Sequence, residues 1–315
     1  MNRFRQFALF STIATYVLIF VGGLVRVSGA GLGCPDWPQC FGHWFPPTSV
    51  DQIPSHIDPS LFNMTLAWIE YGNRVVGVTI GFLIAGTAWL AIKHYRHDKR
   101  ILTASVAAAI LVAFQGWQGS RVVKSQLNPH IISIHFALAL LIISLMVYVT
   151  FRAYKPEQEI KNISDTVYRS VFGWIKIMWV VNLLQILLGT EVRGALEVLA
   201  NAFPLMNEAE LMRQSNYVSY IHGVVGVIIV GATWLFHEQI QRVRTQIPAY
   251  IVTISNIGLL LMITQLFIGV LLVTMDRPPL LQIVHLWISS FQIGLLVIFY
   301  AAWRRDNQSS ERKTV

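Results

Sequence analysis

Eight apolar runs of about 20 residues each constrain the fold of this chain more than any other feature. An α-helix of that length crosses the hydrocarbon core of a bilayer. Charged residues make up 13% of the 315 residues and hydrophobic residues 54%, whereas about a quarter of a soluble globular chain is charged. We therefore predict an all-α integral membrane protein with eight transmembrane helices. The expected spans cover residues 7–27, 66–92, 102–120, 131–151, 171–192, 216–236, 248–274 and 280–303.

The basic residues are distributed unequally between the two ends of these spans. Most of the 24 Lys and Arg residues fall at one side, so the positive-inside rule places both termini in the cytoplasm. The formal net charge of +8 is thereby explained by topology, and no nucleic-acid partner is expected. The first run lacks a convincing cleavage site and no transit segment precedes it, which favours a retained span in a bacterial plasma membrane. The basic residues expected near the outer side are Arg26, Arg121, Lys124, Arg193, Arg213 and Arg277.

The two halves of the chain look like copies of one unit. Three sets of residues recur at an offset of 149 or 150, and a fourth recurs at 167 because the first outer loop is longer. Each copy has four spans, an even number, so both copies have the same orientation. We expect two tandem four-helix bundles related by a pseudo-two-fold axis along the membrane normal. The matched pairs are Asn73 with His222, Gln115 with Gln265, Gly119 with Gly269, His135 with His285, and Arg26 with Arg193.

The repeat divides the chain into four parts. The N-terminal bundle is expected at 1–153 and carries the long outer loop, and the C-terminal bundle is expected at 171–303. A polar, basic cytoplasmic linker at 154–170 joins them, and a polar cytoplasmic tail follows at 304–315.

The two cysteines of the chain, Cys34 and Cys40, both lie in the first outer loop, in the segment CPDWPQC. The outer side of a plasma membrane is oxidising, so a disulfide that closes this short loop is the main expectation. A working redox pair and a metal site that includes His43 remain alternatives.

His222 and His285 fall in the second and fourth spans of the C-terminal bundle. Facing imidazoles at matched depth among apolar residues suit the bis-histidine ligation of a haem. The alternative is two polar side chains that pack helices through hydrogen bonds. Zinc or copper is less favoured, because no nearby Cys, Asp or further His completes a ligand set.

The equivalent pair in the N-terminal bundle is Asn73 and His135. Since Asn is a poor ligand of haem iron, a haem here would have one protein ligand and one open face. Glu70 lies one turn before Asn73 on the same helical face, and its counterpart in the second copy is Ser219. An ionisable group inside a span marks a functional site by default. We therefore expect a resident cofactor in the C-terminal bundle and chemistry beside Glu70, although an i,i+4 pair with Arg74 that steadies the helix is the alternative reading of Glu70.

Arg26 and Arg193 occupy the outer ends of the first and fifth spans. They either anchor the helices at the membrane interface or pair with haem propionates.

The sequence resembles the haem A synthase family, membrane enzymes that oxidise haem O to haem A for cytochrome oxidase. The resemblance covers nearly the whole chain. It rests on the segment GLVRVSGAGLGCPDWPQCFG, on the motif Glu70-x-x-Asn73-Arg74, and on His135, His222 and His285 in alternate spans. The family motif commonly reads Glu-x-x-His-Arg, so Asn73 is a departure from it.

The resemblance implies a haem b whose iron is held by His222 and His285. It also implies a substrate haem O in the N-terminal half, bound through His135 with Asn73 and Arg74 beside it. Glu70 would take part in the successive hydroxylation of the C8 methyl group to a formyl group. The expected partners are a haem O synthase (a farnesyltransferase), the assembly of cytochrome oxidase, an electron donor and a second copy of the chain.

Two other functions are compatible with parts of the pattern. A membrane b-type cytochrome that only transfers electrons would use the C-terminal histidines and leave Glu70 without a role. A transporter would account for the repeat and for polar groups inside the membrane.

Overall fold

The computed structural model describes residues 3–154, 160, 163–206, 208–215 and 217–303. This part of the chain is mainly helical, and eight of its helices are long and apolar enough to cross a membrane, which confirms the predicted fold class. The predicted tail at 304–315 and much of the predicted linker lie outside the described residues. The long helices are α1 (Arg3–Val27), α2 (Met64–His94), α3 (Lys99–Lys124), α4 (Pro129–Tyr154), α5 (Asp165–Ala202), α7 (Tyr217–Arg242), α8 (Ala249–Thr274) and α9 (Pro279–Trp303).

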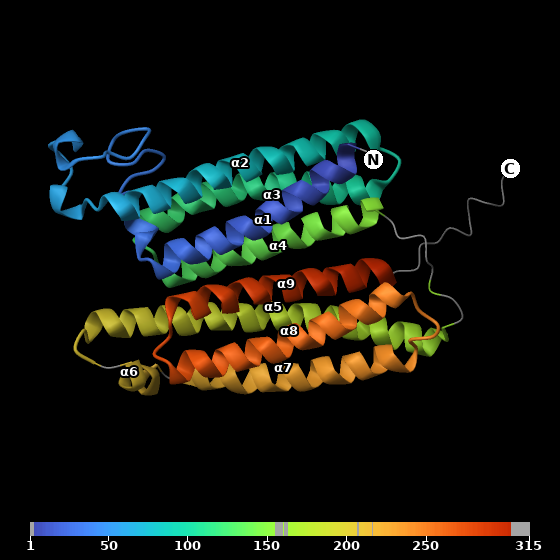
Figure 1. Cartoon of the computed structure of the whole chain (residues 1–315). Coiled ribbons are helices and arrows are strands. Elements are labelled where there is room, and N and C mark those ends of the chain that lie inside the picture. The colour runs from blue at the N-terminus through green and yellow to red at the C-terminus, as the bar shows by residue number, and fades with distance from the viewer. Residues whose placement is uncertain (1–2, 155–159, 161–162, 207, 216, 304–315) are drawn as a thin grey trace.

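The helices form two layers that lie side by side, and each layer is a bundle of four helices (Figure 1). Helices α1 to α4 pack against one another in one layer, and α5, α7, α8 and α9 pack in the other. The layers meet where α1 and α4 contact α9, and where α4 contacts α5. The first outer loop and the short helix α6 (Glu208–Gln214) lie at the same end of the molecule.

The helices α2, α4, α7 and α9 all begin at this loop end. His135, His222 and His285 each lie within the first two turns of their helix, and Asn73 lies about one turn deeper in α2. The four side chains named by the repeat therefore lie toward one end of the helices.

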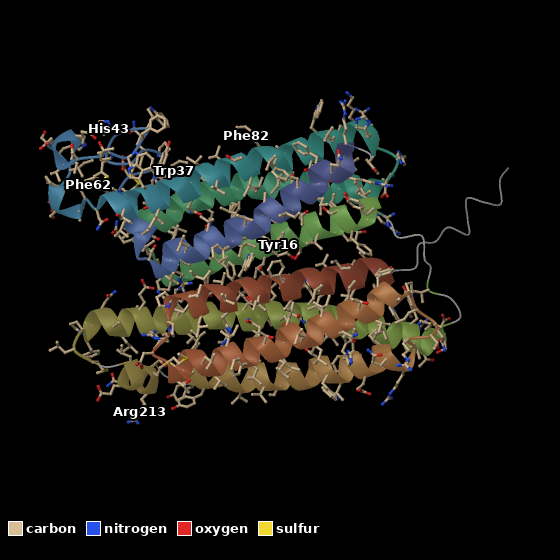
Figure 2. All side chains as sticks on the ribbon, in the orientation of Figure 1. Tyr16, Trp37, His43, Phe62, Phe82 and Arg213 are labelled. Carbon is tan, nitrogen blue, oxygen red and sulfur yellow. A yellow bond between two sulfur atoms is a disulfide. The ribbon has the colours of Figure 1, made fainter. Side chains whose placement is uncertain are left out.

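Small hydroxyl side chains bring helices together within the first layer. The Ser11 hydroxyl lies 3.1 Å from that of Thr87, which joins α1 to α2. The Thr12 hydroxyl lies 2.8 Å from that of Thr150, which joins α1 to α4. Such short polar residues allow close approach and supply hydrogen bonds where no water is present. Phe82, in contrast, points away from the helices and is 74% exposed, as a lipid-facing residue would be (Figure 2).

Polar and aromatic contacts also join the two layers. The indole N–H of Trp287 on α9 donates to the carbonyl oxygen of Tyr16 on α1 at 2.8 Å, and Tyr16 lies between the layers in Figure 2. The hydroxyls of Ser133 on α4 and Thr190 on α5 lie 2.7 Å apart. These contacts hold the two layers together as one packed structure.

Helix α5 is longer than the predicted span at 171–192. The Ser164 side chain caps its N-terminus by accepting from the Val167 N–H at 3.4 Å, so the helix begins inside the predicted linker. At the other end the helix continues past the apolar run, where Arg193 and Glu197 are an i,i+4 pair. Hydropathy located the part of α5 within the membrane, whereas capping and local ion pairs set the ends of the helix.

Candidate functional site

The imidazole rings of His222 on α7 and His285 on α9 face each other inside the second layer. Their centroids lie 6.4 Å apart. Two metal–nitrogen bonds of about 2 Å each, with roughly 1 Å more from each nitrogen to its ring centre, would separate two axial imidazoles by about 6 Å. The observed separation therefore fits one metal centre between the rings.

The Nδ1 atoms of both rings are buried and have no hydrogen-bond partner among the described residues. The described residues therefore supply no hydrogen bond that would fix the tautomer of either ring. The donor set of two neutral imidazoles in apolar surroundings fits a haem better than zinc, and in the described part of the chain no cluster of three or more His, Cys, Asp or Glu could hold a metal ion.

A glycine lies against the ring of each of the three histidines. A methyl group at Gly189 on α5 would come within 2.9 Å of His222 Cε1. The corresponding distances are 3.6 Å from Gly269 to His285 and 3.5 Å from Gly119 to His135. The glycines allow a neighbouring helix to approach the imidazole edge-on.

A glutamine amide also holds the backbone of each of these histidines. Gln115, Gln185 and Gln265 donate from Nε2 to the carbonyl oxygens of His135, His222 and His285, at 2.9, 2.7 and 2.8 Å respectively. The first spans of the two halves are related by the offset of 167, and at that offset Leu18 corresponds to Gln185. The backbone at Asn73 therefore has no such glutamine opposite it. Three of the four positions thus share one framework, and the position of Asn73 differs.

The N-terminal pair differs from the C-terminal pair in its polar contacts. His135 Nδ1 lies 2.5 Å from the Gln118 side-chain oxygen on α3. The Asn73 Oδ1 atom is buried and has no hydrogen-bond partner among the described residues. Gln118 was not predicted as a site residue. The sequence offered one indication of its role, since it lies three residues from Gln115 and therefore on the same face of α3.

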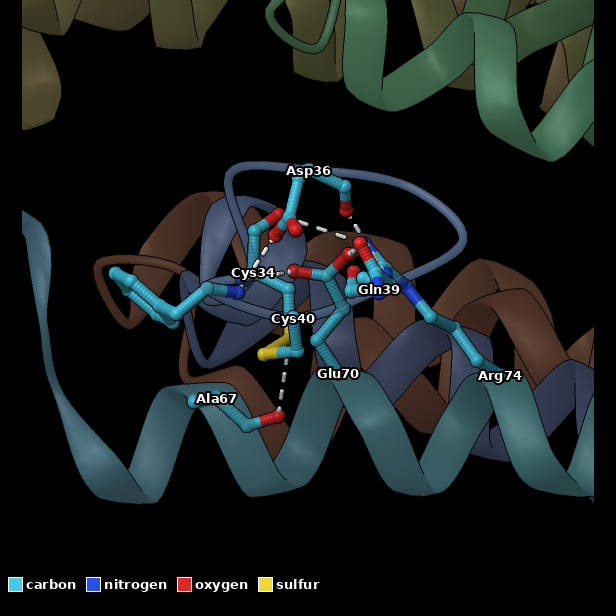
Figure 3. A network of polar contacts seen from close by, with 8 residues as sticks. Cys34, Asp36, Gln39, Cys40, Ala67, Glu70 and Arg74 are labelled. Atoms are coloured by element: carbon cyan, nitrogen blue, oxygen red, sulfur yellow. Dashed lines mark hydrogen bonds and ion pairs between the residues drawn. A yellow bond between two sulfur atoms is a disulfide. The ribbon is translucent and has the colours of Figure 1, made fainter. Parts of the chain in front are cut away.

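Glu70 is buried beneath the first outer loop, with 4% of its surface exposed (Figure 3). One carboxylate oxygen accepts from the Cys34 backbone N–H at 2.8 Å, and the other pairs with Arg74. None of its hydrogen bonds among the described residues joins it to His135 or Asn73. The predicted i,i+4 pair with Arg74 is therefore present, and Glu70 also anchors the loop.

Arg74 completes this anchor. Its Nη1 donates to the carbonyl oxygens of Gln39 at 2.7 Å and Asp36 at 3.0 Å. Cys34 and Cys40 are joined by the predicted disulfide, so they close the same turn covalently. The disulfide thus closes the turn, and the hydrogen bonds from Cys34 to Glu70 and from Arg74 to the Asp36 and Gln39 carbonyls fasten it to α2.

Gly33, next to this turn, shows how closely the loop approaches α2. A methyl group at Gly33 would lie 2.3 Å from the carbonyl oxygen of Leu66, a clash with backbone that cannot be relieved by a side-chain movement. Only glycine fits this position. The backbone of the loop is therefore held in contact with the first turn of α2.

Arg26 and Arg193 lie near each other where the two layers meet at the loop end. The charges of Arg193, Glu191 and Glu197 all act on Arg26. The Arg193 guanidinium donates to the Gln282 side-chain oxygen. Burial, and then the positive charge of Arg193, lower the pKa of the Arg277 guanidinium below its usual range.

Arg277 was assigned to the outer side from the sequence but was not predicted as a site residue. The structure brings its charge close to that of Arg193. Arg26, Arg193 and Arg277 thus lie in one cluster together with Glu191 and Glu197, and guanidinium groups are suited to binding carboxylates.

Known proteins and a known protein family match nearly the whole chain. The sequence model of the family COX15-CtaA, described as cytochrome oxidase assembly protein, matches residues 5–298. The chain is 26% identical over 329 residues to the Heme A synthase of Shewanella oneidensis, which covers 95% of this chain and 96% of that protein. It is 28% identical over 236 residues to the Heme A synthase of Alkalihalophilus pseudofirmus, covering 73% of each chain. The Heme A synthase of Bacillus mycoides is 23% identical over 291 residues, covering 90% of this chain and 88% of that protein.

Proposed function

The chain belongs to the COX15-CtaA family of cytochrome oxidase assembly proteins, and from this premise we propose that it is a membrane oxidoreductase that converts haem O to haem A. The reaction is the successive hydroxylation of the C8 methyl group, through an alcohol, to a formyl group. The observation that carries the proposal is the contrast between the two halves. They share the glycine and glutamine framework around their histidines, but only the first has a carboxylate and an amide where the second has Ser219 and His222.

His222 and His285 would hold the resident cofactor, a haem b, through its iron. The support is the 6.4 Å separation of their rings. When bound, this haem supplies one-electron redox chemistry. Gly189 and Gly269 leave room beside the two rings, and Gln185 and Gln265 hold the backbone at each of them.

His135 binds the iron of the substrate haem O. Asn73, in the place of the second histidine, leaves the other face of the iron open to water or oxygen. Arg26 and Arg193 pair with haem propionates, which is supported by the concentration of arginine charge where the layers meet.

Glu70 accepts or relays protons during hydroxylation. Its partners include the Arg74 guanidinium and the Cys34 N–H, which are donors and offset part of the cost that burial imposes on an ionised carboxylate. The same contacts connect the carboxylate to the first outer loop, so its position depends on the closure of that loop. Arg74 thus serves both the carboxylate and the loop.

We propose a bacterial plasma membrane as the location of the enzyme, with both termini in the cytoplasm. Its substrate comes from a haem O synthase, its product is used in the assembly of cytochrome oxidase, and an electron donor takes part. A second copy of the chain is a further expected partner.

The test of Glu70 is the substitution Glu70→Gln in full-length protein expressed with a source of haem O. We expect haem A in cell extracts to fall by about 100-fold or more, while the spectrum of the resident haem is unchanged. Arg74→Lys is measured beside it as a positioning variant, because it keeps the carboxylate but weakens the loop anchor on which the position of Glu70 depends.

The outcomes of this test separate the candidate functions. Normal haem A from Glu70→Gln would exclude a catalytic role for the carboxylate. A haem-containing wild-type protein that makes no haem A would favour the b-type cytochrome, and a colourless protein would favour a transporter.

A further inference from the structure

The Gln118 side chain bridges two groups on α4 and is itself 5% exposed. Its Nε2 donates to the carbonyl oxygen of Ile131 at 2.9 Å, and its Oε1 lies 2.5 Å from His135 Nδ1. A backbone carbonyl only accepts hydrogen bonds, so the amide nitrogen must face Ile131 and the amide oxygen must face His135. Since that oxygen also only accepts, His135 Nδ1 carries the proton.

A neutral imidazole with its proton on Nδ1 has its lone pair on Nε2. We propose that Gln118 is a positioning residue that keeps His135 in this tautomer and orientation, with Nε2 directed to the iron of the substrate haem. A hydrogen bond from the distal ring nitrogen also makes the ligating nitrogen more basic, which stabilises ferric iron relative to ferrous iron. This inference rests on the proposed binding of haem O through His135.

The second half of the chain provides an internal comparison. The offset of 150 that pairs Gln115 with Gln265 also pairs Gln118 with Ile268, a buried apolar residue. His285 Nδ1 accordingly has no hydrogen-bond partner among the described residues. The two sites therefore share the bond to the histidine carbonyl and differ in the bond to the ring. Gln118 is the residue that makes this ring bond in the substrate site.

Gln118 also joins α3 to α4 through Ile131, and a test must separate this packing role from an effect on the ring. Gln115 is the matched control, because its amide likewise joins α3 to α4, through the His135 carbonyl oxygen, but does not bond the ring. Gln115→Leu and Gln118→Leu each remove one such interhelical bond. Only the second frees His135 Nδ1.

The experiment uses full-length protein purified from cells that make haem O, with optical redox titration of the haem component that His135→Ala removes. We expect Gln118→Leu to raise the midpoint potential of that component and to weaken haem binding by about 10- to 100-fold. Gln115→Leu should leave the potential near that of the wild type. We expect Ile268→Gln to lower the potential of the resident haem, which would give the reciprocal result.

The inference is overturned if Gln118→Leu behaves like Gln115→Leu, or if His135→Ala removes no haem component. Haem A formation by the wild-type protein is measured in parallel. A wild type that holds haem through His135 but makes no haem A refutes the proposed function, while the comparison of the two glutamines still decides the role of Gln118.

Discussion

Gly189 offers the sharpest test of the resident-haem site. A methyl group there would lie 2.9 Å from His222 Cε1, whereas carbon atoms in contact prefer about 3.5–4.0 Å. Gly189→Ala should therefore displace the ring by roughly half an ångström or more. The neighbour is the end of a side chain, so the protein without cofactor can accommodate the change by moving that ring. The matched control is Gly269→Ala, whose methyl group would lie 3.6 Å from His285 Cε1, an ordinary contact.

The size of the effect follows from the overlap. Forcing an extra methyl group into a packed site costs about 1–3 kcal/mol, and the bound cofactor would prevent the ring movement that relieves this cost. At about 1.4 kcal/mol for each tenfold change, haem binding should weaken by roughly 5- to 150-fold. Ala is also favoured over Gly inside a helix by about 1 kcal/mol, so the fold itself should not be destabilised.

The assay compares haem content and the low-spin absorption spectrum of three purified proteins, together with their thermal unfolding. Gly189→Ala should lose haem or change its spectrum, and Gly269→Ala should resemble the wild type. Full haem content with an unchanged spectrum in Gly189→Ala would refute the assignment of His222 as a ligand in this geometry.

Two further predictions concern the contacts that hold the loop and the helices. Arg74→Lys should increase hydrogen exchange in the loop at residues 34–42. The reason is that one ammonium group cannot bond the Asp36 and Gln39 carbonyls and Glu70 in the fork geometry of arginine. Unchanged exchange would contradict the anchoring role. Thr12→Val removes the hydroxyl pair with Thr150. It should lower the free energy of unfolding by about 0.6 kcal/mol, a typical value for a hydrogen bond between membrane helices. A loss above about 2 kcal/mol would show that further contacts depend on this residue.

Most of the architecture could be predicted from the sequence because the membrane imposes it. Without water, each spanning segment must satisfy its own backbone, and a run of about 20 apolar residues has essentially one way to do so. Hydropathy therefore located the eight helices, and the recurrence of Gln115 and His135 as Gln265 and His285 anticipated a shared local framework. The hydrogen bonds from these glutamines to the histidine carbonyls show what the repeated spacing does.

Ends of elements were less predictable, since they depend on local contacts. The start of α5 at Asp165 follows from the Ser164 cap, and its continuation to Ala202 lies beyond the apolar run. Neither is encoded in hydropathy. The short helix α6 in the later outer loop was likewise not expected.

The residue types at the candidate site were determined by the sequence alone: a carboxylate, an amide and three histidines at repeated positions near one end of the spans. Tertiary structure decided which groups these side chains contact. It placed Glu70 under the disulfide-closed turn, brought Gln118 to the ring of His135, and set the rings of His222 and His285 6.4 Å apart. Such contacts join residues on different helices, and their geometry depends on how those helices rotate and approach one another. Helical periodicity sets the face on which a residue lies, but only packing determines what that face meets.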